Sequence, residues 1–528
     1  MAVTIGVDIG TQGSKAAVYT ISGVQVGAAY TPHTITYPGP GLAEMDPEHL
    51  VDCAFTAIAR ALDSAVDNGI DRSQVAGIAL SGILVGQVLL DEDSRILFPV
   101  ITSLDSRAAG HAARAGRDLE PLWAAESGTT TLDAYAAPFQ LQWIRDTHPE
   151  VYARIARTVS VAPYVSGRLA GHGQAQMVTD PTHASGFMVG WDAATGGFSP
   201  AQFELLGLRT DFLPPIVPSD AVIGTVCAEA SRRTGLPVGT PIAAGAGDVQ
   251  QSTLASGMVT AGQATDSAGT TSILTVGVDG IIPAATQIPG LLYSLGTIPG
   301  QSFYWGYVRA GGLSLRWFRD QVASRPQDDA LYAEFDTLAA AVRPGADGVL
   351  FLPYLAGGNP NNPDASGTWL GMDSSTTTGA LWRSALEAVA FEYASTIRTI
   401  EQSSQPLSEV LVTGGGACSD VWNQIKADVT GVPWRRPQRV DGPVLADAAL
   451  ANQAVGLTDS LADQLTAWNQ GGASARPDAA RHACYRDIAQ VRDDLLSGPL
   501  QQVFAGVRTV REVTQRDHRE AVGRALAA

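Results

Sequence analysis

Alternating apolar and polar positions at the start of the chain predict three short strands joined by tight turns. The runs Thr4–Ile9, Lys15–Thr20 and Val24–Thr31 each carry apolar residues at every second position. Turn-forming residues, such as Ser22-Gly23 between the second and third runs, separate them. We therefore expect the first part of the chain to form an antiparallel sheet.

A helix and a further strand are predicted next. Asp46 is a suitable N-cap, Pro47 suits the first helical position, and Asn68-Gly69 suits the C-terminal end. Between these residues apolar side chains recur at helical spacing, and Val75–Leu80 then has the composition of a strand. Hairpin strands followed by a helix and a strand are typical of a mixed α/β domain and not of a Rossmann order.

A similar cycle begins in the second half of the chain. Thr265–Val276 reads as strand, glycine-threonine turn and strand, Leu381–Ile400 as a long helix, and Glu409–Gly431 as strand, glycine turn and helix. A chain of 528 residues is also too long for one hydrophobic core. We predict two α/β domains, residues 1–254 and 255–528, the second ending in a charged helical tail.

Composition narrows the class of protein. The formal net charge of −18 argues against nucleic acid or an anionic membrane as a partner, because such a field repels polyanions. The longest apolar run, Val75 to Leu90, is too short to span a bilayer, and the N-terminus resembles a first strand more than a signal peptide. The four cysteines lack metal-site spacing. We expect a cytoplasmic protein.

Four short segments have the residues needed to hold a nucleotide. They are Asp8–Lys15, Ala246-Gly247-Asp248, Ala268–Ser272 and Thr413–Ala417. Glycine lets the backbone approach a phosphate closely, while turn N–H groups and threonine hydroxyls donate hydrogen bonds to its oxygens. An aspartate at a strand end can hold Mg²⁺ or accept a proton from an attacking hydroxyl. Each segment alone is commonly an ordinary turn or helix cap, so the evidence is their combination and order.

Two common phosphoryl-transfer signatures are absent from the sequence. There is no G-x-x-x-x-G-K-[ST] loop and no H-R-D motif, which excludes a match to P-loop and protein-kinase machinery.

The order of the four segments resembles the sugar-kinase, actin and heat-shock ATPase superfamily, and within it the FGGY carbohydrate kinases. The resemblance spans about residues 3–460 and is carried by segments that include "GVDIGTQGSKAAVY", "GLAEMDPEHL", "LDSRA", "TDPTHASGFMVGWD", "TGLPVGTPIAAGAGDVQQS", "RAGGLSLRWFRD" and "TGGGACSDVWNQIKADVTGVP". It implies two RNase H-like lobes of the actin and hexokinase type, with ATP and a sugar in the cleft between them.

The resemblance also implies a role for each matching residue. Asp248 would be the general base that takes the proton of the attacking sugar hydroxyl, and Asp8 and Asp248 would organise Mg²⁺. The other implied contacts are Thr11, Ser14 and Lys15 around the ATP phosphates; Gly269, Thr270 and Thr271 on the phosphates from the second lobe; Gly312, Gly415, Gly416 and Ala417 along adenine and ribose; and Gly82, Ile83, Asp105 and Arg107 on the sugar.

The positions at which this chain departs from the family pattern bear on which acceptor it phosphorylates. Xylulokinases typically carry Gln-Met-His-Gly after the strand that ends here near Gly82, whereas this chain has Ile83-Leu84-Val85-Gly86. Ser103 and Gln140 also replace an aromatic residue and a lysine. We expect an ATP-dependent kinase for a ketopentose such as xylulose or ribulose. The alternatives are a tetrulose or polyol kinase, a catalytically inactive nucleotide-binding regulator, and an actin-like ATPase. A homodimer is also expected from the resemblance.

Overall fold

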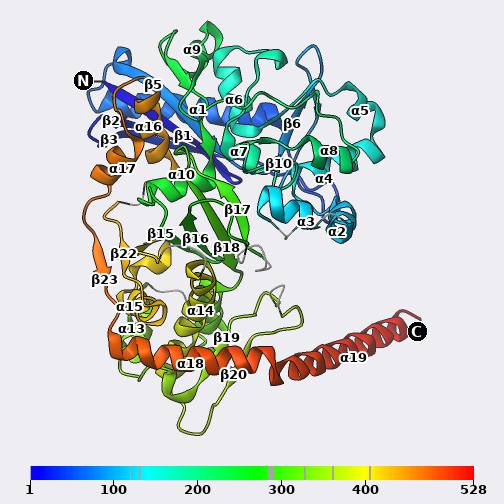
Figure 1. The fold of residues 1–528 in the computed structure, drawn as a ribbon, viewed down its shortest axis with the longest axis vertical. Coiled ribbons are helices and arrows are strands. Elements are labelled where there is room, and N and C mark those ends of the chain that lie inside the picture. Colours follow the sequence, from blue (N-terminus) through cyan, green and yellow to red (C-terminus); the bar gives the residue numbers. More distant parts are fainter. Residues whose placement is uncertain are drawn as a thin grey trace.

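Two β-sheets, one in each lobe, form the framework of the protein in the computed structural model (Figure 1). The structure describes residues 2–118, 120–129, 132–283, 290–325, 329–358, 362–402, 406–439 and 441–527, with side chains undescribed at 117, 118, 120, 329 and 515–527. Within this part of the chain no helix is both long and apolar enough to cross a bilayer.

The first sheet contains the predicted N-terminal hairpins. Strands β1, β2 and β3 pair antiparallel, and β1 then pairs parallel with β5. The sheet runs in the order β12 (Val222–Thr225), β13 (Pro241–Ala243), β5 (Val75–Gly82), β1 (Val3–Ile9), β2 (Gly13–Thr20) and β3 (Gln25–Pro32), with β14 (Ala246–Gly247) also paired to β5. The predicted strands are confirmed, with small differences at their ends.

The second sheet repeats this pairing pattern. Strands β18, β16 and β15 pair antiparallel, and β15 then pairs parallel with β21, which pairs parallel with β22. The full order is β17 (Leu292–Leu295), β18 (Ser302–Val308), β16 (Ser272–Val278), β15 (Gln263–Ala268), β21 (Glu409–Thr413), β22 (Trp434–Arg436) and β23 (Ala473–Ala475). The predicted second α/β cycle is therefore present.

Helix α1 (Pro47–Asp67) begins as the sequence predicts. Asp46 accepts a hydrogen bond from the backbone N–H of Glu48, and Pro47 occupies the first helical position, where its missing N–H costs nothing. Gly69 follows the helix at φ = 89°, a conformation that glycine adopts without a Cβ penalty. The apolar side of α1 packs against β1, β2 and β3.

The two faces of the first sheet bury different kinds of side chain. On β5, Ile78 and Leu80 point into the core shared with α1, whereas Ala79 points to the opposite face. Helix α16 (Pro443–Ala454) covers that opposite face and approaches β1 closely, since a Cβ on Gly6 would lie 1.9 Å from the carbonyl oxygen of Val444. Figure 1 shows α16 and α17 (Leu461–Trp468), in orange, beside the blue strands of the first lobe. Residues from late in the chain thus complete the first lobe.

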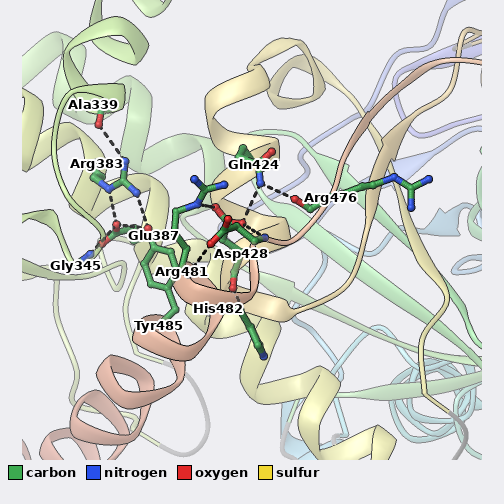
Figure 2. Close-up of polar contacts among 11 residues, drawn as sticks. Ala339, Gly345, Arg383, Glu387, Gln424, Asp428, Arg476, Arg481, His482 and Tyr485 are labelled. Carbon is green, nitrogen blue, oxygen red and sulfur yellow. Dashed lines mark hydrogen bonds and ion pairs between the residues drawn. The ribbon is translucent and has the colours of Figure 1, made fainter.

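A network of polar contacts attaches the C-terminal helix α18 (Ala479–Ser497) to the second lobe (Figure 2). The carboxylate of Glu387, on α14, accepts hydrogen bonds from Arg383 Nε at 2.7 Å and from Tyr485 OH at 2.6 Å. On α15, Asp428 pairs with Arg481 Nε at 2.6 Å. Because Tyr485 and Arg481 belong to α18, the same helix is fixed to two different elements of the second lobe.

The remaining elements complete the two lobes. In the first lobe the helices are α2 (Ala109–Asp118), α3 (Glu120–Leu122), α4 (Ala137–Thr147), α5 (Pro149–Arg154), α6 (Val161–Ala170), α7 (Pro181–Ser185), α8 (Pro200–Leu205), α9 (Ala228–Thr234) and α10 (Asp248–Ala255). In the second lobe they are α12 (Gly311–Trp317), α13 (Asp329–Ala340), α14 (Thr378–Glu401) and α15 (Asp420–Thr430), followed by the C-terminal α19 (Pro499–Ala527). Small sheets pair β4 (Glu44–Met45) with β8 (Val100–Ile101), β6 (Gln87–Leu90) with β7 (Ile96–Phe98) and β9 (Arg157–Ser160), β10 (Trp191–Asp192) with β11 (Gly197–Phe198), and β19 (Leu350–Leu352) with β20 (Thr368–Leu370).

Candidate active site

Asp8 and Asp248 lie at the same end of the first sheet, on either side of strand β5. Asp8 pairs with Ser81 across the β1–β5 ladder, and Ala246 pairs with the same Ser81 across the β14–β5 ladder. Asp248 follows β14 directly and begins helix α10. Parallel strands end at a common edge, which is where ligands bind in open α/β sheets. The fold therefore brings together two carboxylates that lie far apart in the sequence.

Burial and mutual repulsion keep protons on these carboxyl groups at unusually high pH. Burial raises the pKa of Asp8 to about 7, the negative charge of Asp248 adds to the shift, and Lys15 opposes it. Burial likewise raises the pKa of Asp248 to about 6, with the backbone N–H of Val249 and the imidazole of His183 opposing the shift. Perturbed carboxyl groups in a cleft are typical of functional sites.

A third carboxyl group, Asp447 of α16, lies beside this pair and was not identified from the sequence. It is fully buried, and its Oδ2 accepts a hydrogen bond from Ser81 Oγ at 2.8 Å. Burial raises its pKa well above the ordinary value, and the nearby charge of Asp8 adds to the effect. The available sequence signal was one acidic residue inside the apolar run "VLADAALA".

The two carboxylates are suitable ligands for a hard divalent cation that takes most of its ligands from other groups. Among the described residues there is no cluster of three or more histidine, cysteine, aspartate or glutamate side chains able to enclose a metal ion. Asp8 and Asp248 repel each other, so a cation between them would relieve that repulsion. Mg²⁺ commonly takes one or two protein carboxylates and completes its shell with water and phosphate oxygens, which this donor set allows.

The first glycine turn joins β1 to β2 at the edge of the sheet next to Asp8. The backbone N–H of Gly10 donates to the carbonyl oxygen of Gly13 at 3.0 Å, which closes the turn around Thr11. Ser14 Oγ lies 2.8 Å from His33 Nε2, and Lys15 Nζ donates to the carbonyl oxygen of Asp441 at 2.8 Å. The turn has the predicted form, and the phosphate contacts of Thr11, Ser14 and Lys15 stay predictions.

The glycine turns of the second lobe also lie close together. Gly269, Thr270 and Thr271 connect β15 to β16, and the N–H of Gly312 donates to the carbonyl oxygen of Gly269 at 3.0 Å. The turn that contains Gly415, Gly416 and Ala417 follows β21, which pairs with β15 through Ser267 and Thr413. Turns from distant parts of the sequence thus meet at the ends of neighbouring parallel strands.

One cavity connects Asp248 with the turns of the second lobe. Its volume is about 930 Å³, and its wall includes Asp248, Ser252, Thr413, Gly414 and Ala417. Nucleotide-sized ligands occupy cavities of this order. The loop after β22 also contributes to the wall through Arg436, Pro437, Gln438 and Arg439, which the sequence analysis did not select. Two arginines supply positive charge there in an otherwise acidic chain.

The residues predicted to bind the sugar lie in two different environments. Gly82 ends β5 and pairs with Ile9 and Gly247, and Ile83 follows it at this same edge. Asp105 instead is fully buried, and its carboxylate accepts hydrogen bonds from Ala43 N at 2.7 Å and from Arg107 Nε at 2.8 Å.

Arg107 is engaged within the protein as well. Its guanidinium pairs with Glu44 at 2.7 Å and lies 4.8 Å from the ring centre of Trp143. A direct contact of Asp105 and Arg107 with a sugar therefore stays a prediction.

A second network, which the sequence analysis quoted without assigning a role, fixes the backbone before Asp248. The buried carboxylate of Asp180 accepts hydrogen bonds from the hydroxyl and N–H of Thr182 and from the imidazole of His183. Thr182 Oγ1 in turn accepts a hydrogen bond from the N–H of Gly247 at 2.7 Å. The turn that presents Asp248 is therefore held by α7.

Comparison with known proteins gives a consistent result. The N-terminal domain of the FGGY family of carbohydrate kinases matches residues 3–255, and the C-terminal domain matches residues 264–455. The chain is 32% identical to a glycerol kinase of Dechloromonas aromatica, over 88% of this chain and 91% of that protein, and 26% identical to a gluconokinase of Bacillus licheniformis, over 87% and 88%. The crystal structure of a xylulose kinase from Rhodospirillum rubrum superposes with a TM-score of 0.84 at 28% identity, covering 95% of this chain and all of that one.

Proposed function

The chain belongs to the FGGY family of carbohydrate kinases and is an ATP-dependent carbohydrate kinase; we propose that its acceptor is a ketopentose such as xylulose or ribulose. The observation that supports phosphoryl transfer at this site is that Asp248, which flanks the end of β5 together with Asp8, lines one cavity with the glycine turn that follows β21 in the second lobe. Support for a ketopentose comes from the likeness to xylulose kinases in sequence and structure.

Asp248 acts as the general base in this proposal. A sugar hydroxyl is a weak acid, so its oxygen attacks more readily when a carboxylate accepts the proton as the new bond forms. The acceptor oxygen forms a bond to the terminal phosphorus of ATP, the bond from that phosphorus to the bridging oxygen breaks, and ADP leaves with the electron pair. The proton of the hydroxyl passes to Asp248.

The two lobes contribute separate parts of the phosphate site. We propose that Thr11, Ser14 and Lys15 contact the phosphates from the first lobe, and that backbone N–H groups around Gly269 and the hydroxyls of Thr270 and Thr271 contact them from the second. Asp8 and Asp248 would hold Mg²⁺ through water, and this ion, when bound, neutralises charge on the phosphate oxygens. Gly312, Gly415, Gly416 and Ala417 would line the adenosine part of the cleft. The division near residue 255 would then separate the acceptor lobe from the nucleotide lobe.

A smaller or differently substituted acceptor is the second candidate. Leu84 and Val85, the first buried and the second partly buried, are apolar at the position where xylulokinases typically carry Met-His. A pocket without a hydrogen-bonding side chain at that point discriminates less between hydroxyl patterns. This observation favours a tetrulose or polyol, and glycerol kinases are among the relatives of the chain.

An acceptor panel tests the proposal. ADP release is measured with ATP and Mg²⁺ and with a pentulose, a tetrulose, glycerol, gluconate or no acceptor. We expect stimulation by at least one acceptor, and the strongest by a ketopentose. Stimulation only by a tetrulose or polyol would replace the ketopentose with the second candidate. ADP release that no acceptor changes would contradict the kinase assignment, and its rate would separate an acceptor-independent ATPase from an inactive nucleotide-binding protein.

A further inference from the structure

The imidazole of His183 is a buried polar group that the mechanism above does not use. His183 belongs to the short helix α7, and its side chain has no solvent exposure. Its Nδ1 lies 2.5 Å from Oδ2 of Asp180, while its Nε2 has no hydrogen-bond partner among the described residues. A buried polar atom without a partner costs free energy, so it is a candidate contact for a ligand.

The surroundings of Asp180 determine which ring nitrogen carries a proton. The carboxylate of Asp180 accepts hydrogen bonds from the N–H groups of Thr182 and His183 and from the hydroxyl of Thr182. Because these described neighbours are all donors, the carboxylate of Asp180 acts as an acceptor. It orients the imidazole so that Nδ1–H donates to it. The other ring nitrogen, Nε2, is then left to form a hydrogen bond with a ligand, and a ligand hydroxyl is a suitable partner.

Helix α7 lies against the turn that carries Asp248 and against the loop that follows β5. Thr182 Oγ1 accepts a hydrogen bond from Gly247, the residue before Asp248. The side chain of Leu84 fills the space beside both elements, since a Cβ on Gly247 would lie 2.2 Å from its Cδ2 and a Cβ on Gly186 would lie 3.0 Å from it. The second lobe reaches the same place, because the N–H of Leu295 donates to Ser185 Oγ at 3.3 Å.

We propose that Nε2 of His183 forms a hydrogen bond with a hydroxyl group of the acceptor, next to the hydroxyl that Asp248 deprotonates. This inference rests on the proposed function and names a specificity-determining residue for it. The position at which xylulokinases typically carry an imidazole after this strand is occupied here by Val85, and α7 supplies an imidazole from a different element. Because the side chain of Leu84 packs beside α7 and the turn before Asp248, an acceptor that reaches Nε2 must displace it.

The test compares enzyme variants and acceptors in pairs. The variants are His183→Leu, which removes the hydrogen-bonding nitrogen, and His183→Gln, which keeps a hydrogen-bonding group. His172→Leu is the matched control, because His172 also has a buried ring nitrogen without a described partner but packs beside Gly224 at the edge of the lobe. Each is assayed for kcat/KM with the best polyhydroxy acceptor and with its monodeoxy analogues.

One analogue should identify the hydroxyl that His183 contacts. We expect His183→Leu to lower kcat/KM for the complete acceptor by about 10- to 100-fold, and to change it by less than about 2-fold for the analogue that lacks the contacted hydroxyl. His183→Gln should recover part of the loss, and His172→Leu should show no such dependence on the acceptor.

Three results would overturn the inference. An equal loss with every acceptor, deoxy analogues included, would mean that His183 is structural, and unchanged kinetics with all of them would mean that it makes no contact. If His183→Leu does not fold, judged by its unfolding temperature, His183→Gln carries the same comparison. If the parent protein itself phosphorylates no acceptor, the proposed function fails, and this inference fails with it.

Discussion

Asp8 and Asp248 flank the final residues of strand β5 and act on each other through their charges. Ser81 of β5 pairs with Asp8 on one side and with Ala246, two residues before Asp248, on the other. The charge of Asp248 contributes to the raised pKa of Asp8. Had these carboxylates lain on opposite sides of the molecule, no common phosphoryl-transfer site could be built from them. Because the two carboxylates lie close together, changes in pH and substitutions at either residue test the proposed site.

Stability should depend on pH through Asp8. Its pKa is about 7 in the folded protein against 3.8 for the unperturbed group, so between these values the folded state binds more protons than the unfolded state. The free energy of unfolding therefore falls as pH rises from about 4 to about 7. Asp8→Asn removes this contribution and should make the decline in Tm less steep, measured without nucleotide or Mg²⁺. An unchanged slope would contradict a raised pKa of Asp8 in the folded protein.

The rate should depend on pH through Asp248. As the proposed base, Asp248 must be ionised, and burial raises its pKa to about 6. We expect kcat/KM for the acceptor at saturating MgATP to fall tenfold per unit as pH decreases below about 6. The measurement is a profile from pH 5 to 8.5 with ADP release as readout. A profile that is flat down to pH 5 would be incompatible with a base of this pKa.

Nucleotide affinity should be sensitive to the space between Gly312 and the β15–β16 turn. A Cβ at residue 312 would lie 2.4 Å from the carbonyl oxygen of Gly269, so Gly312→Ala must push this turn aside. Displacing packed backbone costs about 1–3 kcal/mol, so the Kd for ATP should rise by about 10-fold or more, measured by calorimetry. Gly506→Ala, with open space around its Cβ, is the control. Equal affinities would place the nucleotide elsewhere.

The second lobe should depend on a buried ion pair. Lys426 Nζ lies 2.5 Å from Asp266 Oδ2, both side chains are fully buried, and Tyr393 OH donates to Asp266 Oδ1 at 2.6 Å. Lys426→Met leaves the Asp266 carboxylate buried without its partner and should lower stability by about 3–5 kcal/mol. The double variant with Asp266→Asn should recover part of this loss in denaturant titrations. A double variant as unstable as the single one would show that the pair is not the cause.

Local signals were sufficient to predict the N-terminal strands, helix α1 and the glycine turns. The cap at Asp46-Pro47 and the alternation in β1 act between neighbours in the sequence, so they can be recognised without a structure. The placement of α16 could not be predicted, because every residue from Val444 to Asn452 is buried and no polar side indicates which lobe the helix covers. The third carboxyl group, Asp447, was missed for the same reason.

Roles that depend on contacts between residues far apart in the sequence could not be predicted either. Asp105 and Arg107 appeared as a sugar-site motif, but their bonds to Ala43 and Glu44 follow from tertiary packing. His183 was visible in the sequence only as one residue of a family segment. Its significance comes from the burial of the ring, the position of Asp180 and the unpartnered Nε2, which no local pattern encodes.

The most direct measurement is the turnover of Asp248→Asn together with its affinity for ATP. The substitution keeps the size of the side chain and removes the base, so kcat should fall by about 10²-fold or more, while the Kd for MgATP changes by less than about 3-fold. Turnover close to that of the parent protein, with ATP still bound, would contradict the assignment of Asp248 as the residue that accepts the acceptor's proton.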